Sequence, residues 1–210
     1  MTNKEHYTRL TTEKRLKLIE ESLNSIYSKE DSANAYEKTL ALINKYKQKV
    51  ESAPYYLTQK DIILITYGDQ VFHSGETALS TLSSFLNEYV RDIINTVHIL
   101  PFYPHSSDDG FSIVNYKGVC PLKGSWKDIE KIRKNHRIMF DGVINHMSQL
   151  SRWFNCYLAD IPEFEDFFIN IDPSTDLSNV VRPRTSPLLT EFVDADGKIR
   201  NIWTTFGSDQ

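Results

Sequence analysis

The chain has 210 residues, 40% of them hydrophobic and 12% aromatic, a composition typical of a globular protein. A net charge of -4 argues against nucleic acid or an anionic membrane as the main partner. The opening residues, MTNKEHYTRL, contain no apolar run of the signal-peptide type, and no stretch approaches the roughly 20 apolar residues that span a membrane. The two cysteines, Cys120 and Cys156, form no CxxC pair. These features predict a cytoplasmic protein with two free thiols.

Residues 1–60 differ in composition from the rest of the chain. They are rich in Lys and Glu, contain no Gly and reach their first Pro at position 54. Apolar residues recur at helical spacing in two segments, 16–26 and 35–46. This pattern predicts two amphipathic helices joined near residues 28–34, which together form a helical leader on the outside of a domain.

From residue 61 onward, short apolar runs alternate with amphipathic segments. The pattern predicts strands at residues 62–68, 97–104 and 137–146, and helices at residues 76–93 and 125–135. Ser125 is the expected N-cap of the second of these helices. Alternation of strand and helix is typical of a parallel sheet in an α/β protein. Because the apolar runs are continuous, we expect these strands to be covered on both faces.

The third predicted strand ends in the sequence FDGVINH, which mixes core and polar residues. Val143 and Ile144 are expected in the core, whereas Asp141, Asn145 and His146 are not. In parallel α/β folds the working residues lie at the carboxyl ends of the strands and in the loops that follow. We therefore expect Asp141 part-way along the strand and the other two polar residues at its lip. The pattern alone also allows a histidine satisfied by the backbone, or a metal site.

Residues 147–210 show no βα rhythm and end at GSDQ without a further predicted strand or helix. Aromatic residues are expected to form the core of a loop-rich inserted subdomain here: Trp153, Phe154, Tyr157, Phe164, Phe167 and Phe168. Long insertions of this kind are usually lids or substrate-shaping loops. The three βα units of residues 61–146 do not close a barrel, which typically needs ~250 residues. We expect the chain to be the first part of a longer protein and to end before the fourth strand.

Six stretches, in this order, resemble the sucrose phosphorylase branch of glycoside hydrolase family 13, the α-amylase family. They are LITYGDQ, VHILPFYP, SSDDGF, FDGVINHMS, RPRTSPLLT and WTTFGSDQ. The resemblance covers residues 61–210. The helical leader and the wording of SSDDGFS, RPRTSPLLT and EDFFINIDPSTDLS look closer to glucosylglycerate phosphorylases than to sucrose phosphorylases. The implied fold is the N-terminal part of a TIM (β/α)8 barrel, with a helical leader and a subdomain inserted after strand three.

The resemblance implies a reversible transfer of a glucosyl group from an α-glucoside to inorganic phosphate, which gives α-glucose 1-phosphate. Retention of configuration needs a carboxylate nucleophile and an acid that protonates the leaving oxygen. In the family these carboxyl groups follow later strands than the three predicted here. The resemblance therefore places no catalytic residue within residues 1–210, and we expect these residues alone to be inactive. It implies no cofactor and a branch of the family without calcium.

Four residues match substrate-binding positions of the family. His146 resembles the histidine that hydrogen-bonds the 6-hydroxyl of the glucosyl ring, and Asp108 resembles the acid that holds the far hydroxyls. Phe111 resembles the aromatic platform beneath that ring. Arg184 resembles a mobile-loop arginine that turns toward phosphate, for which the guanidinium fork is suited. Without the resemblance, the RPRTSP stretch would be a solvated loop stiffened by proline.

Further positions match the acceptor side and the frame of the site. Phe206 and Gln210 resemble residues near the acceptor, whereas Asp141 and Asn145 resemble structural residues that hold the strand end and its loop. Ser112 departs from the pattern, because sucrose phosphorylases carry Asp there. This departure leaves the acceptor open between glycerate and fructose.

Three alternatives to this interpretation remain open. The first is a sucrose phosphorylase, and the second is a hydrolase or transglucosylase in which water or a sugar replaces phosphate. The third is a truncated chain that binds sugar without catalysis. A glycerate carboxylate would require a cation in the acceptor subsite, for which Arg182 and Arg184 are candidates. The oligomeric state is open.

Overall fold

A computed structural model describes residues 10–49, 57–181 and 184–210. The chain divides into two compact units, Met1–Tyr56 and Leu57–Gln210. Arg182 lies outside the described residues.

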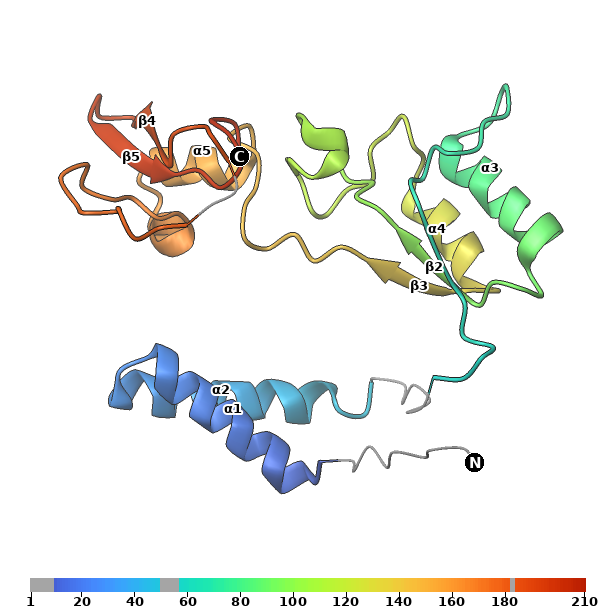
Figure 1. Cartoon of the computed structure of the whole chain (residues 1–210), viewed down its shortest axis with the longest axis horizontal. Coiled ribbons are helices and arrows are strands. Elements are labelled where there is room, and N and C mark those ends of the chain that lie inside the picture. The colour runs from blue at the N-terminus through green and yellow to red at the C-terminus, as the bar shows by residue number, and fades with distance from the viewer. Residues whose placement is uncertain (1–9, 50–56, 182–183) are drawn as a thin grey trace. The chain divides into compact units, whose positions relative to one another are not determined.

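The first unit contains a hairpin of two helices, α1 (Thr12–Ile26) and α2 (Lys29–Tyr46), labelled in Figure 1. Each helix begins with a capped turn, because the Thr11 hydroxyl accepts from the amide of Lys14 and the Ser28 hydroxyl accepts from the amide of Asp31. The two predicted helices are confirmed. Their junction lies earlier than predicted, because the N-cap at Ser28 leaves the residues that follow it inside α2.

A parallel sheet in the order β1-β2-β3 forms the centre of the second unit. Its strands are β1 (Ile63–Thr66), β2 (Thr96–Ile99) and β3 (Arg137–Phe140). Leu64, Val97 and Ile138 lie in register across the sheet, and Ile65, His98 and Met139 form the next row. Side chains of successive residues point to opposite faces, so these two rows belong to different faces. The predicted parallel α/β sheet is confirmed.

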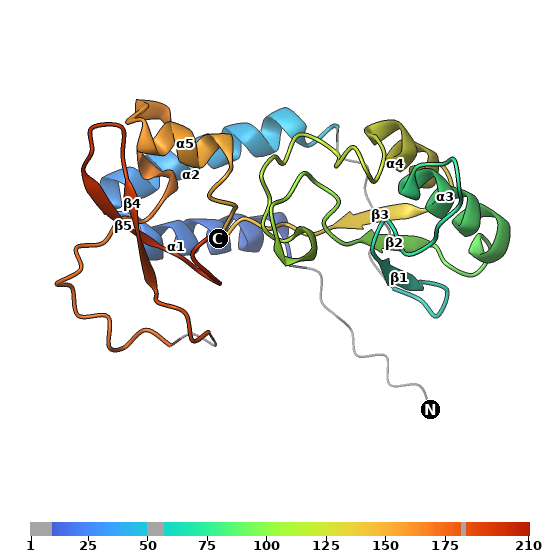
Figure 2. The ribbon, with the colours of Figure 1, turned by 90° about the horizontal axis from the view of Figure 1, so that it is seen from above.

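Two helices cover the face that carries Val97, and Figures 1 and 2 show them next to the strands. They are α3 (Ala78–Phe85), which continues as a π-helical turn (Leu86–Val90), and α4 (Trp126–Arg133). The predicted N-cap of α4 is confirmed, since Ser125 and Asp128 form a capping box. Buried side chains from both layers form one core: Leu79, Leu82, Leu86, Val97, Ile99, Phe102, Tyr103, Ile113, Ile129, Ile132 and Val143.

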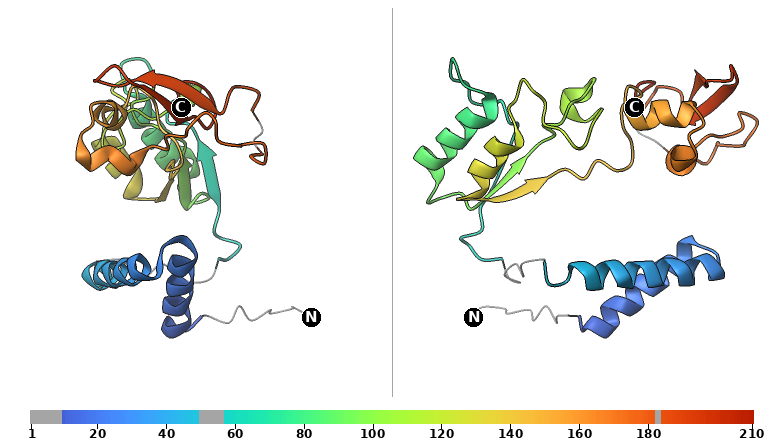
Figure 3. Two further views of the ribbon diagram at one scale, coloured as in Figure 1. Left: turned by 90° about the vertical axis from the view of Figure 1, so that its left-hand side faces the viewer. Right: turned by 180° about the vertical axis from the view of Figure 1, so that it is seen from behind.

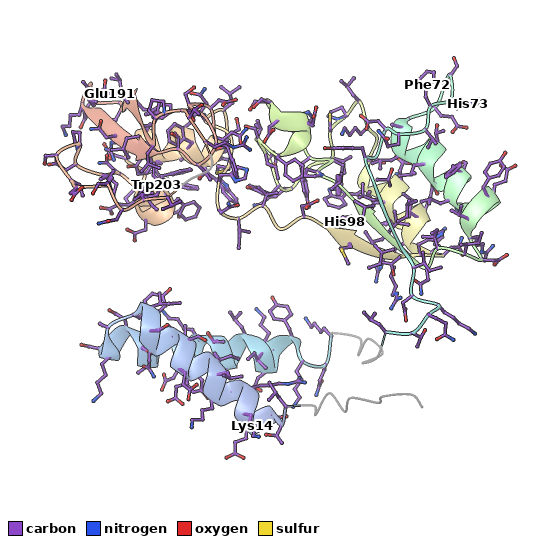
Figure 4. All side chains as sticks on the ribbon, viewed as in Figure 1. Lys14, Phe72, His73, His98, Glu191 and Trp203 are labelled. Carbon is purple, nitrogen blue, oxygen red and sulfur yellow. The ribbon has the colours of Figure 1, made fainter. Side chains whose placement is uncertain are left out.

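The opposite face of the sheet is open to solvent among the described residues, so the expected cover on both faces is wrong for this chain. Ile65 is 62% exposed and Met139 is 41% exposed. The described strands form an open sheet and not a closed barrel. His98, which is labelled in Figure 4, belongs to this face by register. In a (β/α)8 barrel the face opposite the helices is the interior.

The third strand is shorter than predicted, and this changes the position of the polar residues. β3 ends at Phe140, so Asp141 follows the strand, and Asn145 and His146 lie in the loop beyond it. The neighbouring strand β2 ends at Ile99, two residues before Pro101, which has no amide with which to extend the ladder. Within the predicted strand end, Val143 is buried as expected, but Ile144 is 94% exposed.

The region after the third strand is more regular than predicted. It contains α5 (Arg152–Leu158), a 3-10 turn (Pro162–Phe167) and an antiparallel hairpin of β4 (Leu189–Val193) and β5 (Ile199–Trp203). Figure 3 shows these elements together, and in Figure 4 the labels Glu191 and Trp203 mark the two strands. The sequence signal for the hairpin is Asp196-Gly197 between two apolar runs. Gly197 has φ +80°, which suits glycine in a tight turn.

A small aromatic core holds this region together. Phe154, Tyr157 and Ile202 are buried, with Phe164 and Phe168 packed against them. The predicted aromatic core is therefore confirmed for these four aromatic residues. Trp153 and Phe167 lie outside this cluster: Phe167 is 53% exposed, and Trp153 packs edge-on against it.

Candidate functional site

A tight turn after β2 presents Asp108 and Phe111. Asp108 and Asp109 have positive φ values of 56° and 49°, and the amide of Phe111 donates to the carbonyl of Asp108 over 2.9 Å. Gly110 has φ +108°, and a Cβ atom there would lie 2.5 Å from the carbonyl oxygen of Pro101. Only glycine fits such a position without displacing backbone. The Ser-Ser-Asp-Asp-Gly sequence thus forms a strained turn. This turn fixes the backbone positions from which the Asp108 carboxylate and the Phe111 ring extend.

His146 is held against this turn. Its Nε2 atom lies 3.1 Å from the carbonyl oxygen of Phe111, and its Nδ1 atom lies 3.1 Å from Oδ1 of Asn145. A backbone carbonyl only accepts, so Nε2 carries the proton in this bond. Burial lowers the pKa of the imidazole, although the Phe111 carbonyl and Asp108 oppose that change. His146 is therefore a neutral hydrogen-bonding group near pH 7.

Phe206 contacts both His146 and Arg184. The Phe206 ring packs edge-on against the imidazole with 4.6 Å between ring centroids, and the Arg184 guanidinium carbon lies 4.9 Å from the centre of the Phe206 ring. Guanidinium groups over aromatic faces are attracted by the ring quadrupole. The predicted residues from three distant parts of the sequence thus form one stack, with the arginine at its outer end.

The last residues of the chain close the site on another side. Ser107 donates to the Asp209 carboxylate over 2.6 Å, and the amide of Gln149 donates to the Asp209 carbonyl over 3.0 Å. Gln210 lines a cavity of about 670 Å³ together with Asn145 and His146. The Oε1 atom of Gln210 is buried and has no hydrogen-bond partner among the described residues. That oxygen is available to accept a hydrogen bond from a bound group.

Asp141 does not join this group of residues. Its carboxylate lies 3.0 Å from Nε2 of His98, across the third and second strands. Sequence reasoning did not single out His98, whose only sequence signal was a polar residue inside an apolar strand. The pair fixes Asp141 at the strand end.

The side chain of Ser112 is fully buried. The hydroxyl of Ser106 lies 2.9 Å from the Ser112 hydroxyl and 2.7 Å from the Ser148 hydroxyl. This cluster ties the loop after β2 to the loop after β3. A residue at position 112 therefore acts on the site through packing and hydrogen bonds.

The site shows no sign of a metal centre in the part of the chain that is described. No three His, Cys, Asp or Glu side chains of those residues lie close enough together to hold an ion. Among the described helices, none is both long and apolar enough to cross a bilayer.

A parallel α/β sheet with helices on one face, and polar loops gathered after its strands, is the arrangement found in one segment of a (β/α)8 barrel. The crystal structure of sucrose 6F-phosphate phosphorylase from Thermoanaerobacter thermosaccharolyticum is similar, with a TM-score of 0.64 and 31% identity. The similarity covers 74% of this chain and 33% of that one.

The catalytic-domain model of the α amylases matches residues 79–196. The chain therefore belongs to the α-amylase family, glycoside hydrolase family 13. A glucosylglycerate phosphorylase of Spirochaeta thermophila is 44% identical over 199 residues, which are 91% of this chain and 34% of that protein. One from Escherichia coli is 46% identical over 181 residues, which are 82% of this chain and 32% of that protein. The chain thus spans about a third of the length of these relatives.

Proposed function

We propose that this chain supplies the glucosyl-binding part of a retaining α-glucoside phosphorylase of the glucosylglycerate type. The reaction transfers a glucosyl group from the glucoside to inorganic phosphate and gives α-glucose 1-phosphate. The nucleophile and the acid/base belong to family segments that do not match any of residues 1–210. The partners are the glucoside and phosphate.

One observation carries the choice of substrate class. The unit Leu57–Gln210 has 154 of the 210 residues, which is a smaller share of the chain than the 91% that is aligned with the Spirochaeta thermophila protein. That alignment therefore includes part of the helical hairpin. Similarity to the sucrose 6F-phosphate phosphorylase covers 74% of the chain and has a lower identity, 31%. The helical leader and the higher identity both favour glucosylglycerate over sucrose 6F-phosphate.

In this proposal the residues of the turn and of the stack have different binding roles. Asp108 accepts hydrogen bonds from hydroxyls of the glucosyl ring, and Phe111 packs beneath the ring. His146 forms a hydrogen bond with the 6-hydroxyl of the ring as a neutral imidazole, because burial keeps the pKa of His146 low. Phe206 and Gln210 face the acceptor. Asp141 holds the frame through His98, and Asn145 lies beside the His146 ring in the loop that follows β3.

Arg184 is the candidate for phosphate. Its guanidinium rests on Phe206 and leaves a planar fork that matches two phosphate oxygens. A phosphate bound there would lie beside the residue that also contacts His146. This arrangement favours a phosphorylase over a hydrolase.

The test is an assay of the protein expressed from the whole reading frame that contains these residues. We expect phosphate-dependent release of α-glucose 1-phosphate from glucosylglycerate, faster than from sucrose. Faster turnover of sucrose would favour the sucrose phosphorylase alternative, and glucose release without phosphate would favour a hydrolase. Residues 1–210 alone are expected to show no turnover.

The role of Arg184 is tested in the same assay. Arg184→Ala is expected to raise KM for phosphate about tenfold or more, because a charge-assisted hydrogen bond is lost. Arg133→Ala, at an exposed position of α4, is the matched control and should leave that KM unchanged. An equal KM for phosphate in both variants would exclude the proposed role.

A further inference from the structure

The hydroxyl of Tyr116 joins two carbonyl groups of the loop after β3. It donates to the carbonyl of Val143 over 2.6 Å and lies 3.0 Å from the carbonyl of His146. One phenolic proton is shared between them, with the shorter contact dominant. Burial raises the pKa of Tyr116 to about 12, so the hydroxyl keeps its proton at physiological pH.

The two carbonyls are held very differently apart from this bond. Val143 is buried in the main core with the side chains of the sheet and its helices. His146 is three residues further along a segment, 141–147, that belongs to no strand or helix. Outside a strand ladder a backbone carbonyl needs another donor, and the Tyr116 hydroxyl is the donor to the carbonyls of Val143 and His146. The Tyr116 hydroxyl therefore links the backbone of His146 to the backbone of Val143, which the core holds in place.

The ring of Tyr116 is itself fixed. It stacks on Trp153 at 5.6 Å and lies 6.0 Å from Tyr103 between ring centroids. Its neighbours therefore come from the core loop after β2 and from α5. Replacement of the hydroxyl alone would leave this packing in place.

We propose that Tyr116 is a positioning residue that sets the location of His146 for the glucosyl group. The inference rests on the proposed function only for the identity of the ligand. The imidazole already reaches the turn through Phe111, and its backbone needs the phenol to keep that 3.1 Å bond. Loss of the hydroxyl is expected to loosen the bond between Nε2 and the Phe111 carbonyl.

The test is Tyr116→Phe, which keeps the ring, against Tyr103→Phe, which removes a neighbouring hydroxyl that makes no bond to the described loop residues 141–150. The first readout is the Nε2 proton of His146 in the 210-residue chain, followed by nuclear magnetic resonance with labelled histidine. We expect this proton to exchange with solvent about tenfold faster in Tyr116→Phe, as loss of one hydrogen bond allows. Tyr103→Phe should leave the rate unchanged.

Unchanged exchange in Tyr116→Phe would overturn the inference, and so would equal acceleration in both variants. The second readout is the phosphorylase made from the whole reading frame. There Tyr116→Phe should raise KM for the glucoside about tenfold and change kcat less, because a ground-state contact is weakened. If the unaltered enzyme does not use glucosides, the proposed function fails, while the exchange measurement still decides the role of Tyr116.

Discussion

The sheet region and the β4–β5 region of the second unit bury their apolar residues in different ways. In the sheet region, eleven buried residues, most of them aliphatic, form one core; they come from β2, from α3 and the turn that continues it, from α4, and from the loops after β2 and β3. In the β4–β5 region, only three buried residues, two of them aromatic, form the core. The first region is stabilised by a large continuous apolar cluster, and the second depends more on a few aromatic contacts and polar ties.

The segment between these regions follows neither pattern. Residues 141–150 carry His146 and are held by hydrogen bonds to the Tyr116 hydroxyl, the Ser106 hydroxyl and the carbonyl of Phe111, which accepts from the His146 ring. Net hydrogen bonds contribute about 1 kcal/mol each, less than a buried aliphatic side chain. Stability and site geometry are therefore separable. Substitutions in the core should alter the free energy of unfolding, whereas loss of these hydrogen bonds should alter the position of His146.

The largest expected effect tests the sheet core. Leu82→Ala removes a side chain of α3 that is 2% exposed and leaves a cavity, which should lower the free energy of unfolding by about 2–5 kcal/mol. Urea unfolding measures this change. Leu122→Ala, at a position 89% exposed, is the matched control and should lie within about 0.5 kcal/mol of the unaltered protein. Equal losses in the two variants would contradict the assignment of this core.

A smaller effect tests the turn that carries Asp108. Gly110→Ala forces a Cβ against the Pro101 carbonyl at positive φ, which should cost about 1–3 kcal/mol and displace the turn. Gly142→Ala is the control, because a Cβ there meets nothing within 4 Å. Urea unfolding compares the two. A Gly110→Ala protein as stable as Gly142→Ala would show that the turn is not strained.

The smallest effect is confined to acid and concerns His136. Its side chain is buried, and neither ring nitrogen has a partner among the described residues. Burial lowers the pKa of His136 below its ordinary value of about 6.5. The unfolded state then binds more protons as pH falls below that value, so this contribution to stability is present above it and lost in acid.

When the pH falls from about 7 to about 5, across the unfolded pKa of about 6.5, His136→Leu should therefore lose less stability than the unaltered protein. Urea midpoints at the two pH values give the comparison. His73→Leu, at an exposed loop position, should keep the full pH dependence. The same pH dependence in all three proteins would show that His136 is not titrated on unfolding.

Much of the second unit followed from local patterns. The strands, the helices and the cap at Ser125 were predicted from apolar periodicity and residue type, although strand ends were placed too far along the chain. The apolar run of β2 continues past Ile99, where the strand ends, to Pro101, which has no amide with which to extend the ladder. The hairpin at Asp196-Gly197 carried a clear turn signal that the sequence analysis did not use.

The sequence by itself determined the order of strands and helices and the motifs of the α-amylase family, because both depend on residues close together in the chain. Tertiary structure alone decided which distant groups meet: Tyr116 with His146, His98 with Asp141, and Ser107 with the Asp209 carboxylate. These partners are 30, 43 and 102 residues apart. Such pairs depend on the paths of whole loops, which no local periodicity encodes.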